Sequence, residues 1–401
     1  MFKINNKSIR QILNLGLVFG VVMIVSCKDK SETSKRDPNA YYSGIEKVGL
    51  HDVVVCDVSK IKRKVRMPLS KLVDTCEIIY LETKDASILP QLGRFAVSDS
   101  YLCVGGFGKP LKLFRRDGSY ICDIGKIGRG PGEYNYTPAQ IILDEKRNSI
   151  FIISAFGIDK ILQYDLKGNF VEAISLRYKS PKARIWIDAD TITIASMVFN
   201  EEIPIVYQQT FDGELIQELP RDKHLVARSD YSNEVFSNNR PDYGFQILSA
   251  DTLFHYNAQK NELESQLVFP PFTNSGGQLL WELPEHYIGV SYVARKNRKT
   301  GKIEGRDMYN VIINKKTLET RCYELINDFY GGISHSSLSS CKNDMFIAST
   351  PAFKLMNEIK EILKDNKLGL KNKQKLKKIL SHLHVNDNDV LFVGKLKQTG
   401  N

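Results

Sequence analysis

The sequence predicts an all-β fold, a six-bladed β-propeller, and three observations carry this prediction. A polar turn followed by a short apolar or alternating run recurs six times along the chain. Most of these runs are followed by a strand, a tight turn and another strand. A lone strand-like segment lies near each end of the repeated region, where a ring of sheets needs strands that close it. About four short strands in each unit, at a regular period, are typical of propeller blades.

The six recurring runs set the period of the repeat. They are YLCVGG (101–106), SIFIIS (149–154), TITIAS (191–196), TLFHYN (252–257), HYIGVSY (286–292) and MFIAST (345–350). Asp99 and Asp344, in the first and last of the polar turns, enclose five intervals, so the mean period is about 49 residues. Several of these runs are apolar at consecutive positions, as expected for strands whose two faces are both buried between neighbouring sheets.

Hairpin signals follow the recurring runs. Asp117-Gly118, Lys167-Gly168 and Asp212-Gly213 each separate two strand-like segments. Glycine supplies the positive φ that a tight turn requires, so these pairs predict β-hairpins. Looser versions of the same pattern occur in FHYNAQKNELESQLVF (254–269) and NVIINKKTLETRCYEL (310–325).

The two lone segments are CEIIYLE (Cys76–Glu82) and DVLFVGKLK (Asp389–Lys397). We expect them to pair within the last blade, so that an N-terminal strand closes the ring. One stretch, residues 353–383, has helical spacing instead of strand alternation. Its apolar residues are Leu355, Ile359, Ile362, Leu376, Ile379, Leu380 and Leu383. Gly369 interrupts the pattern, which predicts a helical hairpin inserted in blade six.

The N-terminus predicts export and lipidation. A basic start is followed by a short apolar run that ends in MIVSC, and this order is typical of a secretory signal. The Cys at the end of the run resembles a bacterial lipobox. We therefore expect residues 1–26 to be a lipoprotein signal peptide and 27–45 to be a lipid anchor at Cys27 followed by a flexible tether. We expect residues 46–401 to form the propeller. This predicts a protein anchored to a membrane by its lipid, in the cell envelope and at the outer membrane, facing either the periplasm or the cell surface.

The net charge of +10 is a local property. Between Lys354 and Leu380 there are nine Lys against Glu358, Glu361 and Asp365, and the basic signal accounts for most of the remaining excess. The charge therefore does not predict nucleic-acid binding. The Lys-rich face of the helical hairpin is either solvated or attracted to anionic lipid or an acidic partner.

The sequence predicts no catalytic residues, no metal site and no cofactor. Six Cys remain after Cys27, and their spacing fits neither a CxxC motif nor a metal site, so most are expected to be buried single thiols. His382 and His384 have no further ligand at a set spacing, and His335 has no residue that would orient it as a base. No P-loop, GxSxG or HExxH motif is present.

The loop GKIGRGPGEY (125–134) is the most distinctive local motif. It links the outer strand of the first unit to the inner strand of the second. One interpretation is a structural clasp, in which Arg129 pairs with Glu133 or backbone carbonyls and Tyr134 packs between blades. The other is a ligand-binding site, in which Arg129 holds a carboxylate or sugar hydroxyls and Tyr134 stacks on a ring. The candidate ligand-binding residues are Arg129, Glu133 and Tyr134.

The loop IGRGPGEY, the upstream PLSKLVDTCEIIYLET, the six units and the late helical insert together resemble a known family. This is the group of six-bladed β-propeller lipoproteins of gut-type Gram-negative bacteria, which are similar to NHL-repeat propellers. The resemblance covers about Met67–Lys397. It departs at Asp389, where family members often have proline, and this concerns only the entry to the last strand. The resemblance implies the fold and the envelope location, and it implies no activity.

The expected function is therefore binding. We expect an envelope-anchored lipoprotein that holds a glycan, a peptide or a protein partner, such as an outer-membrane protein, through a face of the propeller. The alternative is a propeller enzyme, a lyase or hydrolase, that acts at the central channel. None of the seven His repeats at an equivalent position of the units, which favours binding over catalysis.

Overall fold

The structure is a computed structural model, and it describes most of the chain after residue 39. The described residues are 40–398 without 62, 90–91, 107, 136–137, 200–202, 223–224, 228–233, 238–241, 248–249, 270–275, 298, 336–340 and 343. Contacts divide the chain into Met1–Asn39 and Ala40–Asn401, and only the second unit contains described residues. The predicted signal peptide and Cys27 thus lie outside the described residues. Strands already occur from Tyr41 onward, within the stretch 27–45 that we predicted as anchor and tether.

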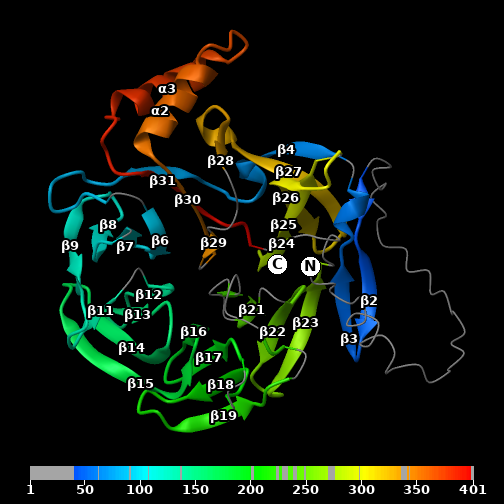
Figure 1. Cartoon of the computed structure of the whole chain (residues 1–401). Coiled ribbons are helices and arrows are strands. Elements are labelled where there is room, and N and C mark those ends of the chain that lie inside the picture. Colours follow the sequence, from blue (N-terminus) through cyan, green and yellow to red (C-terminus); the bar gives the residue numbers. More distant parts are fainter. Residues whose placement is uncertain are drawn as a thin grey trace, which may run out of the picture. The chain divides into compact units, whose positions relative to one another are not determined.

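The described residues are mostly β, with two α-helices, in a β-propeller-like arrangement (Figure 1). Within them, six sheets have four or more strands each. Five sheets form blades, and one curled sheet resembles half of a barrel. The predicted fold class is thus confirmed at the level of a propeller-like β-protein.

Three consecutive sheets are simple four-stranded antiparallel meanders. The first has β6 (Leu92–Val97), β7 (Tyr101–Gly106), β8 (Leu111–Arg115) and β9 (Tyr120–Ile124). The second has β12 (Gln140–Asp144), β13 (Ser149–Ile153), β14 (Ile158–Asp165) and β15 (Phe170–Ser180). The third has β16 (Ala183–Ile187), β17 (Ile192–Ser196), β18 (Val206–Gln209) and β19 (Leu215–Leu219). All the strands and hairpins predicted for this part of the chain are present.

The next three sheets each include strands from the beginning of the unit. The fourth has β20 (Val235–Ser237), β21 (Gly244–Ile247), β22 (Thr252–Asn257) and β23 (Glu262–Val268), with β2 (Gly44–Val48) and β3 (His51–Val55) at its outer edge. The fifth has β24 (Gly276–Glu282), β25 (His286–Lys296), β26 (Ile303–Asn314) and β27 (Glu319–Asn327), joined by β1 (Tyr41–Tyr42), β4 (Lys64–Pro68) and β28 (Ile333–His335). The sixth has β29 (Cys341–Lys342), β30 (Met345–Thr350), β31 (Val390–Lys395) and β5 (Glu77–Tyr80).

The segment from Tyr41 to Tyr80 therefore lies along the outer edges of three successive sheets, as the blue strands of Figure 1 show. β3 pairs in parallel with β23, β4 pairs in parallel with β27, and β5 pairs antiparallel with β31. The pairing of β5 with β31 confirms the predicted partnership of Cys76–Glu82 with Asp389–Lys397. The strands before β5 were not predicted. Two short 3₁₀ helices, Val58–Lys60 and Leu69–Lys71, connect the segment's strands, and a third, Asp328–Tyr330, follows β27.

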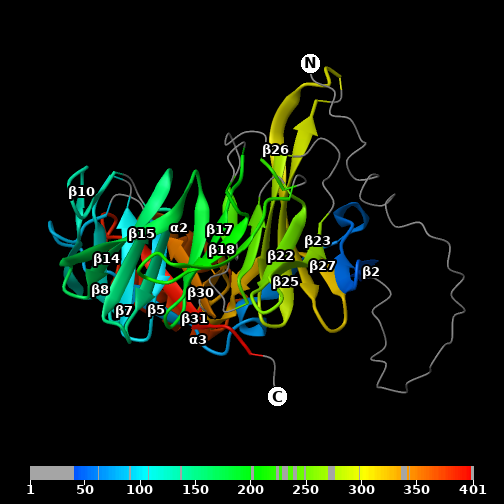
Figure 2. The same cartoon turned by 90° about the horizontal axis from the view of Figure 1, so that it is seen from below.

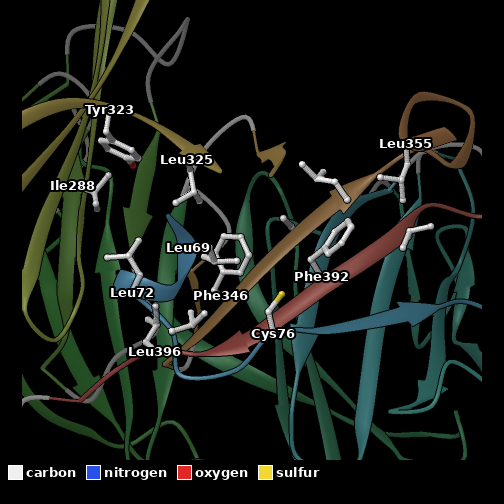
Figure 3. Packing of buried hydrophobic residues seen from close by; sticks show 14 of the residues in the cluster. Leu69, Leu72, Cys76, Ile288, Tyr323, Leu325, Phe346, Leu355, Phe392 and Leu396 are labelled. Carbon is white, nitrogen blue, oxygen red and sulfur yellow. The ribbon is translucent and has the colours of Figure 1, made fainter. Parts of the chain in front are cut away.

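Hydrophobic clusters join each sheet to the next. One of them contains Ile79 of β5, Leu391 of β31 and Leu102 of β7, so the sixth sheet packs directly against the first. Another joins the fifth and sixth sheets, where Figure 3 shows Leu69, Tyr323, Phe346 and other buried side chains packed together. The sixth sheet is thus held on both sides, and its two strands from opposite ends of the unit close the ring.

The predicted turn glycines also contribute to contacts between sheets. Gly118 has a φ of +91°, and a Cβ there would lie 2.1 Å from the carbonyl oxygen of Tyr80 in β5. Gly168 has a φ of +85°, and its Cβ would lie 2.4 Å from the carbonyl oxygen of Asp123 in β9. The turn at Gly118 therefore packs against β5 of the sixth sheet, and the turn at Gly168 packs against β9 of the first sheet. The contact that closes the ring, between the sixth and first sheets, is thus of the same kind as the contact between the first and second sheets.

The helical segment is present as α2 (Ala352–Ile362) and α3 (Leu370–Ser381), between the paired strands β30 and β31. Its buried residues include Leu355, Ile359, Leu376 and Ile379, which join the cluster between the fifth and sixth sheets. The apolar stripe thus packs on the sheets as expected. No described helix is both long enough and apolar enough to span a bilayer.

The five cysteines whose side chains are described, Cys56, Cys76, Cys103, Cys122 and Cys322, form no disulfide. Four of them are buried, and burial raises the pKa of Cys56 and of Cys76 to about 12. These are protonated core thiols, as the sequence predicted.

Candidate functional site

The loop Gly125–Tyr134 lies between the first and second sheets and is held by its own backbone. β10 (Lys126–Ile127) pairs in parallel with β11 (Glu133–Tyr134), which turns the loop back on itself. The amide of Gly128 donates to the carbonyl oxygen of Tyr134 at 3.1 Å, and the amide of Glu133 donates to that of Gly130 at 3.0 Å.

Glu133 and Tyr134 are both used inside the fold. The Glu133 carboxylate accepts a hydrogen bond from the Gly130 amide at 2.8 Å. Tyr134 is 4% exposed and belongs to the core between the first and second sheets. Its hydroxyl donates to the Ile124 carbonyl oxygen and accepts from the Leu111 amide, both at 2.7 Å. This tyrosine therefore fastens the loop to two strands of the first sheet.

Two glycines of the loop leave space for rings of the second sheet. Gly125 has a φ of +62°, and a Cβ there would lie 2.7 Å from the Tyr164 hydroxyl. Gly132 has a φ of +68°, and its Cβ would lie 2.6 Å from the Phe170 ring. The Tyr164 hydroxyl also donates to the Gly132 carbonyl oxygen. These two glycines thus allow both the positive φ of the loop and the close approach of the two rings.

Arg129 differs from the other two candidate residues because its side chain is exposed at the tip of the loop. The pairing of Arg129 with Glu133 that the clasp interpretation included is not among the ion pairs of the described residues, and Glu133 contacts backbone instead. The ligand-binding role of Arg129, Glu133 and Tyr134 stays a prediction. Of these three residues, Arg129 alone has an exposed side chain with hydrogen-bond donors for a ligand.

A second group of polar residues, which we call the charged cluster, lies where the fourth and fifth sheets meet. It consists of Asp242, His255, Glu282 and Lys315. Asp242 precedes β21, His255 lies within β22, Glu282 ends β24, and Lys315 follows β26. His255 Nε2 contacts Glu282 Oε2, and Lys315 Nζ contacts Glu282 Oε1. Lys315 Nζ also lies 4.9 Å from the centre of the Tyr287 ring.

Glu282 is the buried centre of this cluster, with 5% of its surface exposed. Burial alone would raise the pKa of its carboxyl, but the contacts with His255 and Lys315 hold that pKa below its usual value. Burial raises the pKa of the neighbouring Tyr287 phenol, and the charges of Glu282 and Asp242 add to this effect. Glu282 is therefore a carboxylate at neutral pH, held by partners on both of its oxygens.

Asp242, His255 and Glu282 each offer one ligand atom, and these three atoms lie within 4.8 Å of one another. Sequence reasoning missed this group because its members are far apart in the chain and follow no motif spacing. Only the pairing of β21 with β22 and the packing of β24 beside them bring the three together. The sequence offered one weak signal, a histidine between Phe254 and Tyr256 in the strand-like run TLFHYN.

Two of the histidines considered from the sequence, His335 and His382, make packing contacts within the fold. His335 is 5% exposed, lies against the rings of Phe346 and Phe392, and contacts Asn327 Nδ2 at 3.1 Å. Burial lowers its pKa to about 4. His382 stacks on Tyr80 near the end of α3.

Comparisons with known proteins agree with the fold. The structure of a "putative exported protein" (BF0058) from Bacteroides fragilis NCTC 9343 matches with a TM-score of 0.57 and 14% identity, over 84% of this chain and 99% of that chain. At this identity the match shows the fold alone. Two further structures match with low TM-scores. They are the computationally designed Ika4 protein (0.29, 11% identity, 48% of this chain and 98% of that one) and apo AztD from Citrobacter koseri (0.33, 9% identity, 58% and 73%).

No curated protein sequence matches the chain. A family match, by contrast, covers residues 53–395, from β3 to the end of β31. This range includes both the loop and the charged cluster. The chain therefore belongs to the family described as Domain of unknown function (DUF4934).

Proposed function

We propose that this protein is an envelope-anchored binding lipoprotein that holds its partner through one face of a six-bladed propeller. In this proposal the curled sheet takes the place of the sixth blade, and a lipid on Cys27 holds the chain at the outer membrane. The similarity to a Bacteroides protein described as exported supports a location outside the cytoplasm. Among a glycan, a peptide and a protein, we argue for a protein partner with an acidic surface.

The observation that carries the proposal is the hairpin formed by β25 and β26, which extends beyond the other strands in Figure 2. β24 pairs with β25 no further than Tyr292, and β27 pairs with β26 only at 311–313. The outer half of the hairpin is thus a two-stranded ribbon in the described residues. Such a ribbon is marginally stable by itself and gains from packing against another surface.

The ribbon has the chemistry of a docking surface. Ile303 is 62% exposed, Met308 46% and Tyr309 39%. Between residues 295 and 307 the sequence has six Lys or Arg against Glu304 and Asp307. Exposed apolar side chains on a segment with an excess of basic residues favour a partner that is both apolar and acidic at the contact.

A photo-crosslinking residue at Met308 tests the proposal in cells that produce the full chain. We expect one discrete protein adduct, whereas the same residue at Ile216, a comparably exposed position on β19, gives none. The purified adduct partner then binds the full chain with an affinity that falls with salt, and Ile303→Ser with Met308→Ser weakens it at least tenfold. Equal adducts at both positions, or binding that the double variant leaves unchanged, would refute the proposal.

The anchor is tested separately. Mass spectrometry of the mature N-terminus is expected to find a lipid on Cys27, and Cys27→Ser is expected to release the protein from the membrane fraction. An unmodified Cys27 in a membrane-associated protein would contradict the anchor and would leave the hairpin proposal standing.

A further inference from the structure

We propose that Asp242, His255 and Glu282 bind a divalent zinc ion at the junction of the fourth and fifth sheets. This inference is independent of the hairpin and of its partner. It starts from the three ligand atoms, which lie within 4.8 Å of one another although they come from three separate elements.

The donor set fits zinc better than calcium or magnesium. One imidazole nitrogen and two carboxylates are ligands that zinc takes in proteins, at about 2.0–2.2 Å from the ion. Calcium takes six to eight oxygens, and magnesium prefers an octahedron of oxygens and waters. Three protein ligands fill three positions of a tetrahedral zinc site and leave the fourth for water or a bound group.

Gly244 keeps the space beside these ligands open. It lies opposite His255 in the pairing of β21 with β22. A Cβ at Gly244 would lie 3.3 Å from Asp242 Oδ1 and 3.5 Å from His255 Nε2. Its φ is not in the left-handed region, so the turn geometry does not require glycine here. The absence of a side chain instead leaves room between two of the proposed ligands.

The contacts within the cluster are compatible with an ion. His255 Nε2 and Glu282 Oε2 are in hydrogen-bond contact, and a zinc ion would take the place of this hydrogen bond between the same two atoms. Lys315 Nζ contacts the other oxygen of Glu282 and need not move. In a tetrahedral site with ligands at about 2.1 Å from the ion, the ligand atoms lie about 3.4 Å apart. His255 Nε2 and Glu282 Oε2 are now in direct hydrogen-bond contact, so they must move apart for an ion to bind between them.

The site is partly open to solvent, as ion entry requires. The side chain of His255 is 19% exposed, whereas that of Glu282 is 5% exposed. The buried Glu282 thus fixes the inner side of the site, and the partly exposed His255 lets an ion enter from solvent.

A second triplet, His51, Glu262 and Glu264, provides the matched control. Its ligand atoms also lie within 4.8 Å of one another. However, Lys260 Nζ lies 3.3 Å from Glu262 and 3.4 Å from Glu264 at the outer edge of the fourth sheet. One ammonium therefore already lies within ion-pair distance of both glutamates of this triplet.

The test is calorimetric titration of zinc into the full chain after treatment with a chelator, with metal content measured after dialysis. We expect one zinc ion per chain, with a dissociation constant at or below the micromolar range, and no comparable heat with calcium. His255→Gln and Asp242→Asn should each weaken binding at least tenfold, and His51→Ala should leave it unchanged.

Two results would overturn the proposal. One is a folded wild-type chain that takes up no zinc above the level of the triple variant Asp242→Asn, His255→Gln and Glu282→Gln. The other is zinc binding that His51→Ala abolishes and Asp242→Asn does not affect. Circular dichroism of each variant checks that it is folded, and Asp242→Asn keeps the size of the side chain, so a loss of binding in a folded variant is not a loss of fold.

Discussion

The loop Gly125–Tyr134 and the charged cluster differ in how they relate sequence to structure. The loop is conspicuous in the sequence, and its glutamate and tyrosine are satisfied within the loop and the strands next to it. The charged cluster is inconspicuous in the sequence, and its side chains meet only because two sheets pack together. A distinctive local motif is thus explained by packing, while the packing of two sheets brings together a group of candidate metal ligands from segments without a motif.

The largest effect should come from filling the space that the loop glycines leave. Gly132→Ala combines a positive φ with a Cβ that would lie 2.6 Å from the Phe170 ring. We expect it to lower the free energy of unfolding by about 3 kcal/mol, measured by urea denaturation. Gly301→Ala is the control, because Gly301 has a φ of +67° with nothing within 4 Å of its Cβ. It should cost only about 1 kcal/mol, and equal losses in the two variants would contradict the packing role of the loop.

Tyr134→Phe should have the next largest effect. It removes a buried hydroxyl and leaves the Leu111 amide and the Ile124 carbonyl without that partner. Each unsatisfied buried group costs about 1–3 kcal/mol, and with both groups near the lower end of that range we expect a loss of about 2 kcal/mol in the same denaturation experiment. Tyr120→Phe, whose exposed hydroxyl donates to Asp123, should cost clearly less. A neutral Tyr134→Phe would show that the loop is not fastened through this hydroxyl.

In the charged cluster, Glu282 should make stability depend on pH. Its pKa is lowered in the folded state, so the unfolded chain binds its proton more readily. The resulting stability is fully present above the unfolded-state pKa of about 4.3 and is lost as the pH falls through the folded-state pKa. Glu282→Gln should therefore be less stable than the wild type at pH 7, by about 2 kcal/mol, and the difference should shrink at acid pH. A difference that is constant from pH 7 to pH 3 would contradict this account.

His335 should contribute a separate dependence at higher pH. Its pKa is lowered by burial to about 4, so stability is full above the unfolded-state pKa of about 6.5 and falls as the pH drops toward 4. The shift corresponds to about 3 kcal/mol over this window. His335→Gln should flatten the profile between pH 6.5 and 4, and an unchanged slope in this variant would show that another group titrates there.

The smallest effect should come from Arg129→Ala. The side chain is exposed, and the contacts of the loop are made by its neighbours. We expect the midpoint of thermal unfolding to stay within about 2 °C of the wild type. A loss comparable to that of Tyr134→Phe would show that the Arg129 side chain stabilises the loop, as the clasp interpretation holds.

Much of the fold could be predicted from the sequence because its determinants are local. Gly118, Gly168 and Gly213 mark hairpin turns by chemistry that needs no neighbour, and the apolar runs mark buried strands. The outer strands β2, β3 and β4 could not be predicted in the same way. All three are short, and β2, which pairs with β3 in a short hairpin, is exposed throughout. β3 and β4 pair with β23 and β27, which lie more than 200 residues further along the chain, so no local pattern records these pairings.

The two candidate sites also differ in how far the sequence predicted them. The loop motif predicted both a clasp and a binding site, and the structure shows its glutamate and tyrosine turned to internal contacts. The prediction that the chain holds no metal ligands rested on spacing along the sequence. It did not anticipate His255 and Glu282 meeting across a sheet boundary, because a distance of 27 residues carries no information about contact.

The most direct test of this account is anomalous diffraction at the zinc absorption edge, from crystals of the protein grown with one equivalent of zinc. The account predicts a single strong anomalous peak bounded by Asp242, His255 and Glu282, and none at the loop. A peak only at His51, Glu262 and Glu264, or no peak at either triplet, would contradict the claim that the junction of the fourth and fifth sheets is a metal site.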